Sequence, residues 1–370
     1  MKIDGLAIHL IATGMRSKRA HGVGDVEHKV KRVILELRTD TGLVGLGEAA
    51  PWEVFSGTAE AAAAAIDVYL RPVLTGADPA RAPAIMAQCD AALVGHPEAK
   101  AAVEMALLDL VGKQAGVPVS TLLGGRCRDA IALSFSLANP DLAHDIATAK
   151  AMIAEGHRIF KVKTGFADHR TDLARLSALR RELPETIDLR VDYNQGLAAW
   201  DALPKLRDVE AFKPTFIEQP VPREARDTMA ALTAALDTPV MADESVFSPE
   251  DMLAAARTRL CDLVSVKLMK AGGIARARAV AEIAAAAAMP CYGGTLWEGG
   301  IALAAACHFI AATPNMALGC EFYAPRYAFE SDVVATPLAV GGGAVRVPDG
   351  PGLGMTLDRD ALKAATVATR

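Results

Sequence analysis

The sequence is poor in aromatic residues and has no surplus of positive charge. Only 5% of its 370 residues are aromatic, and 39 Lys plus Arg stand against 44 Asp plus Glu, which gives a formal net charge of −5. A weakly acidic chain without a long basic run is a poor ligand for nucleic acid and for an anionic membrane surface. We therefore expect neither partner. Hydrophobic residues make up 52% of the chain, which excludes a disordered protein.

Cysteine is scarce and scattered, and long apolar runs are missing. The six cysteines include no C-x-x-C pair, so they are typical of reduced core residues rather than of a disulfide or zinc framework. The longest apolar runs, 283–290 and 301–312, are shorter than the ~20 residues that cross a bilayer. Asp4 and His9 interrupt the start of the chain, which is unlike a signal peptide. We expect a cytoplasmic protein.

Residues 1–125 form one expected unit, of the α+β type. Strand-like runs at 2–12 and 29–39 and a short one at 44–48 predict an antiparallel meander. Helical patterns follow it at 58–70, 79–93 and 98–115, and the last ends at a Gly-x-Pro sequence that is typical of a helix C-terminus. Strands followed by helices favour a small α+β module.

From residue 126 to 339, an apolar run, a polar tip and an amphipathic helix follow one another eight times. The runs lie at 131–138, 158–165, 187–196, 214–220, 239–245, 261–273, 289–300 and 315–322. Continuous apolar runs indicate parallel strands covered on both faces, and a repeat of ~25 residues predicts a (β/α) barrel. The alternative, an open doubly wound sheet, would place a glycine-rich phosphate loop early in the chain, and none opens a helix here.

Acidic side chains end three consecutive expected strands of the barrel. Asp192, Glu218 and Asp243 are spaced in step with the repeat, at intervals of 26 and 25 residues. Residues in equal phase meet at the carboxyl-terminal mouth, where barrel enzymes place their catalytic groups. Three converging carboxylates without His or Cys suit one hard divalent cation, Mg²⁺ first and Mn²⁺ second.

Lysines occupy equivalent positions of the repeat before and after these acidic residues in the sequence. Lys161 and Lys163 are two residues apart on one strand, so their side chains share a face. Two neighbouring ammonium groups should lower a lysine pKa toward the range of a general base. Lys267 lies on the sixth strand, roughly across the mouth. A cation between opposed lysines fits proton transfer at the carbon next to a carboxylate, whereas Lys270 is expected to be structural.

The sequence resembles the enolase superfamily, and within it the muconate-lactonizing subgroup. The resemblance rests on segments that span nearly the whole chain: GEA at 47–49, LLGG at 122–125, KVKTG at 161–165, DYNQG at 192–196, IEQP at 217–220, ADES at 242–245 and SVKLMKAGG at 265–273. It implies a capping domain over residues 1–125 and a modified (β/α)₇β barrel of the TIM type over 126–339, with the tail 340–370 packing back on the cap.

The resemblance also implies roles for individual residues. Metal ligation falls on Asp192, Glu218 and Asp243, and acid–base roles fall on Lys163 and Lys267. Lys161 would assist Lys163 electrostatically, and Asn194 and Glu244 would orient these groups. The implied enzyme binds one Mg²⁺ or Mn²⁺, acts on a small carboxylate and forms a homo-oligomer.

Choosing within the family depends on the last two strands. Residues 289–298 lack the His of the mandelate racemase subgroup, and the eighth strand, GCEFYAP, lacks the Asp-x-Asp of dipeptide epimerases. Glu298 and Glu321 instead resemble muconate cycloisomerases, although each could simply bond lysines or backbone. The expected activity is a cycloisomerase of the muconate type. A racemase or epimerase of an N-substituted or cyclic amino acid or dipeptide, and an inactive barrel serving as an interaction module, stay open.

A loop between the first two strands is expected to cover the mouth. Residues 14–25 combine cations with Gly22 and Gly24, which permit hinge-like changes of the backbone. In related enzymes the equivalent loop contacts the distal part of the substrate. The second carboxylate of a dicarboxylate substrate is therefore expected to bind Arg16, Lys18, Arg19, His21 or a backbone N–H of the turn at Gly22.

Overall fold

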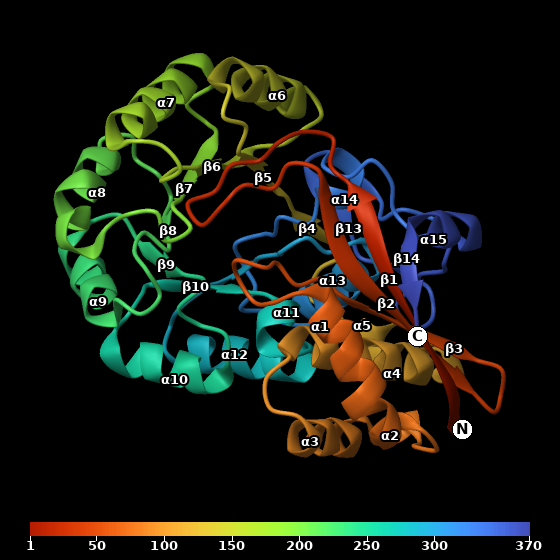
Figure 1. The fold of residues 1–370 in the computed structure, drawn as a ribbon. Helices are drawn as coiled ribbons and strands as arrows, with labels where there is room; N and C mark the ends of the chain where they lie inside the picture. The colour runs from red at the N-terminus through yellow and green to blue at the C-terminus, as the bar shows by residue number, and fades with distance from the viewer.

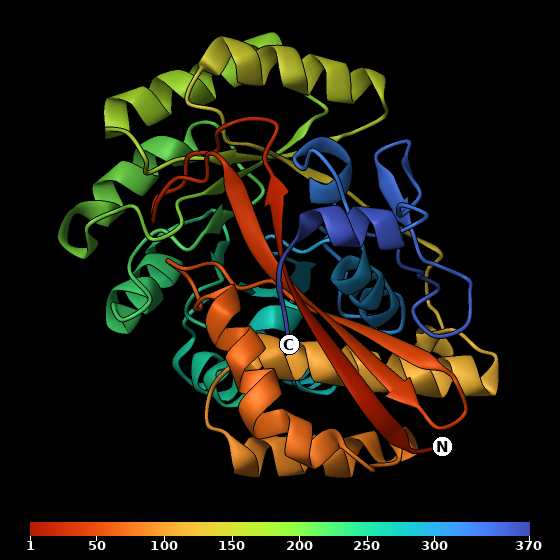
Figure 2. The same ribbon diagram turned by 45° about the vertical axis from the view of Figure 1, so that its right-hand side comes forward.

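The cap is built on an antiparallel sheet in the order β14-β1-β2-β3 of the computed structural model, which describes all residues from 1 to 370. β1 (Ile3–Gly14), β2 (Lys29–Thr39) and β3 (Val44–Ala49) form the predicted meander. The fourth strand, β14 (Thr366–Thr369), comes from the C-terminus and pairs with β1. Figure 2 shows β1 and β2 as a long ribbon with the C-terminus beside it.

Helices cover one face of this sheet. They are α1 (Ala59–Ala64), a π-helical turn η1 (Ala65–Leu70), α2 (Arg71–Leu74), the 3₁₀ turn η2 (Pro79–Arg81), α3 (Ala82–Ala92) and α4 (Pro97–Ala115). The continuous helix predicted over 58–70 is therefore interrupted by the π turn. α4 packs so closely on β3 that a Cβ at Gly47 would lie 1.9 Å from the carbonyl oxygen of Ala102. Only glycine permits that approach.

The barrel is a curled sheet of seven parallel strands that follow chain order. They are β5 (Ser134–Leu137), β6 (Ile159–Lys163), β7 (Asp188–Asp192), β8 (Ile217–Glu218), β9 (Val240–Ala242), β10 (Leu263–Val266) and β11 (Cys291–Gly293). The covering helices are α6 (Leu142–Ala154), α7 (His169–Glu182), α8 (Ala202–Glu210), α9 (Arg226–Ala235), α10 (Pro249–Thr258), α12 (Ile274–Ala286) and α13 (Gly300–Ala311). They ring the strands in Figure 1.

The eighth predicted unit closes the ring without forming a regular strand. Cys320 makes parallel bridges to Gly293 at the end of β11 and to Leu133 just before β5. The molecule is thus a modified TIM barrel with an N-terminal cap, as the sequence predicts. Buried apolar residues form a large cluster that fills the barrel and extends into the cap, a second cluster within the cap, and a small third cluster of Phe216, Met241, Leu263 and Tyr292. None of the helices is long and apolar enough to cross a membrane.

The C-terminal tail divides between the two units. β12 (Val340–Gly341) pairs with β13 (Ala344–Arg346), and β13 pairs with β4 (Ala130–Ala132), which leads into the barrel. The expectation that the whole tail lies on the cap is therefore wrong for its first part. Beyond it, α15 (Arg359–Ala365) and β14 lie along β1. Arg359 donates two hydrogen bonds of 2.7 Å to the Glu36 carboxylate of β2, which anchors this end to the cap.

The loop between β1 and β2 lies across the carboxyl ends of the barrel strands, drawn in red in Figure 1. The backbone N–H of Ala20 donates to the carbonyl oxygen of Ala138 after β5, at 2.8 Å. Gly22 packs so closely on the segment after β7 that a Cβ there would lie 2.0 Å from the carbonyl oxygen of Tyr193. The cap therefore supplies one wall of the barrel mouth.

Candidate active site at the barrel mouth

The predicted site residues meet at the carboxyl ends of neighbouring strands. In the strand register, Lys163 of β6 lies beside Asp192 of β7, and Asp192 lies beside Glu218 of β8. Asp243 and Lys267 follow directly after β9 and β10. Parallel strands of one barrel bring residues of equal phase to one level, so side chains spread over a hundred residues share one buried cluster. All five are buried.

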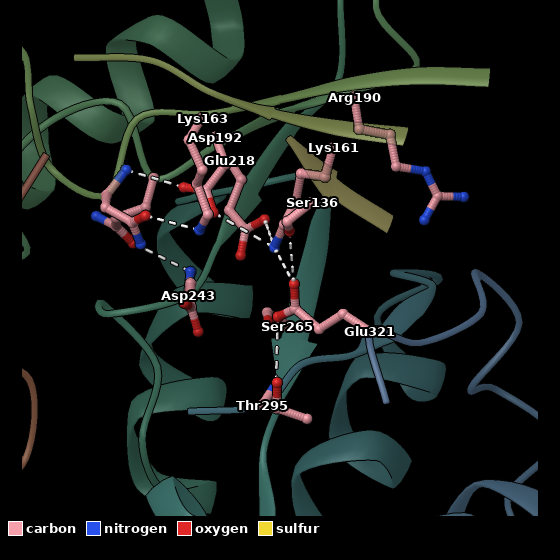
Figure 3. A network of polar contacts seen from close by, with 12 residues as sticks. Ser136, Lys161, Lys163, Arg190, Asp192, Glu218, Asp243, Ser265, Thr295 and Glu321 are labelled. Carbon is pink, nitrogen blue, oxygen red and sulfur yellow. Dashed lines mark hydrogen bonds and ion pairs between the residues drawn. The ribbon is translucent and has the colours of Figure 1, made fainter. Parts of the chain in front are cut away.

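Lys161 is at the centre of the polar network (Figure 3). Its Nζ lies 2.8 Å from a Glu218 oxygen, 2.9 Å from Glu321 and 3.3 Å from Asp192. Burial lowers the pKa of Lys161, but the charges of Glu218 and Glu321 outweigh burial and hold the pKa well above its usual range. The sequence alone predicts that neighbouring lysines lower a lysine pKa. For Lys161 that expectation is wrong, because the carboxylates lie closer to it.

Lys163 has different partners. It donates to Asp192 and, at 2.7 Å, to the side-chain oxygen of Asn194. Asn194 in turn donates to Glu244 at 3.1 Å. Burial, followed by the charges of Asp243 and Asp192, raises the pKa of Glu244 to about 7. Asn194 and Glu244 therefore support Lys163 and its neighbours, and of these two only Asn194 also lines the pocket.

Asp243 is held by two lysines. Lys267 donates to one carboxylate oxygen and Lys270 to the other, each at 2.7 Å. Lys270 also donates to the carbonyl oxygens of Asp243 and Ser265. Burial alone would raise the pKa of Asp243, but both ammonium groups keep it well below its usual value. The sequence predicts a structural role for Lys270 but does not identify Asp243 as its partner. The available signal is the position of Lys270 one helical turn after Lys267.

The three carboxylates have the chemistry of a divalent cation site, although they do not form a ready-made cage. No group of three or more His, Cys, Asp or Glu side chains in the structure is close enough to hold a metal ion as it stands. However, Glu218 Oε1 is buried with no hydrogen-bond partner. Burial is the main reason that the pKa of Glu218 rises well above its usual value, and the charges of Asp192 and Asp243 add to the rise. The charge of Lys161 opposes it without cancelling it. An added cation would remove this cost, so the donor set fits one hard divalent ion.

A pocket opens beside this cluster, between cap and barrel. The barrel contributes Lys163, Asn194, Lys267, Glu321 and Tyr323, among others. The cap contributes Arg19, His21, Trp52 and Phe55. His21 is a candidate from the sequence, whereas Trp52, Phe55 and Tyr323 are not. Single aromatic residues far apart in the sequence form no recognisable motif, and only the folded structure brings them together.

The remaining candidates lie at the edge of the pocket or behind its wall. Glu321 accepts from Lys161 and from the backbone N–H of Thr295 at 3.2 Å. Glu298 accepts from the N–H of Leu296, and burial is the main reason that its pKa rises to about 8. Neither Glu298 nor Gly22 lines the pocket. Gly22 instead allows the cap loop to pack on the barrel.

His21 lies between the cations and the aromatic side chains of this pocket. Burial is the first reason that its pKa falls well below its usual value, and the charges of Lys163 and Arg19 add to the effect. The imidazole packs edge-on against Trp52 and Trp297, with ring centres 5.0 and 5.8 Å apart. The pocket therefore combines fixed cations with an aromatic wall.

Comparison with known proteins places this geometry among known enzymes. Residues 18–124 match the family model "Mandelate racemase / muconate lactonizing enzyme, N-terminal domain", and residues 144–361 match "Enolase C-terminal domain-like". The chain is 35% identical to muconate cycloisomerase 1 of Pseudomonas putida, covering 89% of each chain. It is also 34% identical to the L-Ala-D/L-Glu epimerase of Bacillus subtilis, covering 89% of this chain and 90% of the relative.

Solved structures give the same two kinds of neighbour. A muconate cycloisomerase from Azorhizobium caulinodans is 49% identical, with a TM-score of 0.88 and coverage of 99% of this chain and 98% of the other. An N-succinyl Arg/Lys racemase from Bacillus cereus is 30% identical, with a TM-score of 0.95 and coverage of 100% and 99%. Similarity to cycloisomerases and to racemases therefore coexists in one chain.

Proposed function

We propose a reaction for this chain on the premise that it belongs to the mandelate racemase / muconate lactonizing enzyme family of the enolase superfamily. It is an isomerase of that superfamily, and we infer that it is a metal-dependent cycloisomerase of the kind that converts cis,cis-muconate to muconolactone. The observation that carries the proposal is that Lys163 and Lys267 line one pocket beside three buried carboxylates.

In this proposal Asp192, Glu218 and Asp243 hold one Mg²⁺ or Mn²⁺. When bound, the ion supplies positive charge that stabilises negative charge developing on a substrate carboxylate. The unpartnered oxygen of Glu218 and the mutual repulsion of the acids support this assignment. Lys161 holds Glu218 in place and Lys270 holds Asp243 in place, each through an ion pair.

The lysines that line the pocket have separate tasks. One carboxylate oxygen of the substrate adds to its own carbon–carbon double bond and closes the ring. The electron pair of that bond moves to the carbon next to the second carboxylate, and Lys163 Nζ gives its proton to that carbon. Lys267 Nζ lies 4.5 Å from the centre of the Phe55 ring and acts as a fixed cation. Its charge stabilises the anionic intermediate without a proton leaving Nζ.

The charges of the pocket favour a substrate without an ammonium group. Glu321 is the acid that lines the pocket, and it is already bonded to Lys161 and Thr295. Arg19, Lys163 and Lys267 supply positive charge. A dipeptide amino group would therefore find no free carboxylate, whereas a dicarboxylate finds several donors.

One observation favours a second candidate function. Two lysines reach the same pocket from β6 and from the end of β10, which is the arrangement that a 1,1-proton transfer needs. A racemase or epimerase acting on an N-acylated amino acid would remove the α-proton with one lysine and return a proton with the other. In this reaction Lys267 would exchange a proton instead of remaining a fixed cation.

The two reactions differ in what D₂O and lysine variants do. With Mg²⁺ and cis,cis-muconate, we expect the ultraviolet absorbance of the diene to disappear and one deuterium to enter the product. Lys163→Met should lower turnover by roughly 10²–10⁴-fold or more. Lys150→Met is a control, because this lysine is exposed and paired with Glu182.

Other outcomes would contradict the proposal. If muconate is unchanged while an N-acyl amino acid exchanges its α-proton and loses optical activity, the racemase is correct. In that case Lys267→Met should retain exchange with only one enantiomer. If no carboxylate of either class reacts in the metal-loaded protein, the inactive-barrel alternative replaces both.

A further inference from the structure

One short segment of the barrel carries both lysines that bind Asp243. Lys267 follows β10 directly and precedes α11 (Leu268–Ala271), a helix of a single turn that contains Lys270. Lys267 lines the pocket, and Lys270 holds the other carboxylate oxygen of Asp243. A movement of residues 267–273 would therefore displace two ammonium groups of the site at once.

This segment ends in a turn of two glycines that lies against the cap. Gly272 and Gly273 have φ angles of 86° and 128°, a region that side chains other than glycine rarely adopt. A Cβ at Gly273 would also lie 2.1 Å from Oε2 of Glu104, which belongs to α4 of the cap. The two glycines therefore bring the backbone directly against the Glu104 carboxylate.

Glu104 binds the first turn of the next barrel helix. Both of its carboxylate oxygens accept from the backbone N–H of Ala275, at 3.3 and 3.2 Å. Ala275 is the second residue of α12, a helix of 13 residues. The first N–H groups of a helix lack partners within the helix and favour a negative charge. Because α12 begins directly after the two glycines, a carboxylate fixed to its first turn also fixes the end of residues 267–273.

The Glu104 carboxylate is buried without a counter-ion. It is 6% exposed, and Lys100, one turn earlier on α4, pairs with Asp90 instead. Burial is the main reason that the pKa of Glu104 rises to about 7, while the N–H groups of Ala275 and Ile274 oppose the rise. Burying an acid without a cation costs free energy. Its contribution therefore lies in the contact with α12 rather than in the stability of α4.

Two further cap contacts hold the same segment from the side. The backbone N–H of Ala50, after β3, donates to Met269 Sδ at 3.3 Å. Pro97, the first residue of α4, lies 3.5 Å from the position that a Cβ of Gly272 would occupy. α11 and α12 both pack on α4 (Figure 1). Neither of these two side contacts is charged, so Glu104 supplies the only carboxylate among the three.

We propose that Glu104 is a positioning residue of the active site: by binding the first turn of α12, it holds residues 267–273 so that Lys267 and Lys270 stay on Asp243. Glu104 does not line the pocket, and its effect reaches the lysines through the backbone of the glycine turn. The inference rests on the proposed function only where turnover is measured.

Hydrogen exchange in the Mg²⁺-loaded full chain tests the inference without a substrate. Glu104→Ala removes a charged acceptor, a loss that corresponds to a factor of roughly ten or more. We expect exchange over residues 267–276 to become about tenfold faster and exchange over residues 15–26 to stay unchanged. Asp109→Ala is the matched control, because Asp109 is also a buried acid of α4 but accepts from the N–H groups of Leu46 and Leu353, each at 2.8 Å. It should leave residues 267–276 unchanged.

Steady-state kinetics separates positioning from a general structural role. Glu104→Ala should lower kcat roughly 10–100-fold, because a small misplacement of a catalytic group is costly. KM should stay within about twofold, since the walls of the pocket are intact. Glu104→Gln keeps one acceptor oxygen and should recover part of kcat. Asp109→Ala should lower stability and leave kcat unchanged, because the segment that it holds lies in the cap and the tail.

Other results would overturn the inference. They are unchanged exchange over residues 267–276 in Glu104→Ala, faster exchange with an unchanged kcat, or equal effects of Glu104→Ala and Asp109→Ala. If Glu104→Ala fails to fold, Glu104→Gln repeats both measurements, and values equal to those of the unaltered protein reject the inference. If exchange changes as expected in a protein that converts no muconate, the proposed function alone fails. Conversion of muconate that does not depend on Glu104 would reject the positioning role alone.

Discussion

Glu48 of the cap binds the backbone of the barrel at Gly299, across 251 residues of sequence, with its Oε1 2.7 Å from the amide nitrogen. The same carboxylate accepts from the N–H of Ala302 and from Arg32, whose side chain is fully buried. It therefore caps the N-terminus of α13, where partial positive charge and free N–H groups favour an anion. Through this contact the cap holds the turn that carries Trp297.

Removing this charge should destabilise the whole molecule. Glu48→Gln leaves Asp332, 3.5 Å away, as the only acidic partner of the buried Arg32, and breaking a buried ion pair costs about 3 kcal/mol or more. Urea unfolding should show that loss. Glu60→Gln is the control, because its partner Lys31 is on the surface and surface pairs contribute little. Equal stability of the two variants would contradict the cap-to-barrel role of Glu48.

Metal removal should abolish activity and lower thermal stability together. The buried acids repel one another in the absence of an ion, and a ligand that binds only the folded state stabilises it by about 2.7 kcal/mol at a hundred times its Kd. We expect added Mg²⁺ to raise Tm in the chelator-treated protein. Glu218→Gln should lose this response, whereas the exposed Glu250→Gln should keep it. A Tm response that survives in Glu218→Gln would remove this residue from the ligand set.

Acid should weaken the junction between the cap and the tail. Burial alone would raise the pKa of Glu36, but His9 and Arg359 outweigh it and hold the pKa at about 2. A carboxylate with a lowered pKa stabilises the fold above its unfolded value near 4.5, and this contribution is lost as pH falls through about 2. Because Arg359 is mostly exposed, we expect only about 1–2 kcal/mol.

Urea unfolding at two pH values measures this contribution. At pH 7 the unaltered protein should be more stable than Glu36→Gln by that amount, and the difference should shrink at pH 3. Arg359→Gln should show the same trend. A difference between the two proteins that does not change with pH would assign the effect to packing rather than to charge.

Crowding the contact at Gly22 should open the cap loop. In Gly22→Ala the new Cβ would lie 2.0 Å from the carbonyl oxygen of Tyr193 and 2.8 Å from that of Asn194. Because the backbone atoms after β7 cannot shift easily, the loop must move instead, which should lower the free energy of unfolding by about 1–3 kcal/mol. We expect faster hydrogen exchange over residues 15–26 and a higher KM. Gly341→Ala is the control, since nothing lies within 4 Å of its Cβ position; an unchanged exchange rate in Gly22→Ala would show that the packing is loose.

The periodicity of the sequence was enough to predict the barrel and the place of its acidic residues. Continuous apolar runs repeat about every 25 residues, and Asp192, Glu218 and Asp243 keep step with them. In a closed parallel barrel, residues at equivalent positions of successive repeats lie at the same height along the barrel axis. The pairing of Lys163, Asp192 and Glu218 shows this. The eighth unit was recognised for the same reason, although its hydrogen bonds are reduced to bridges at Cys320.

Only the tertiary structure decided which charges pair and which donors stay free. Lys161 and Lys163 look alike in sequence, yet Lys161 bonds Glu218 and Glu321 while Lys163 bonds Asp192 and Asn194. Arg19 meets Ser136 and Tyr323 from 117 and 304 residues away. No local pattern encodes such contacts, because their energies depend on distance and burial after the chain has closed.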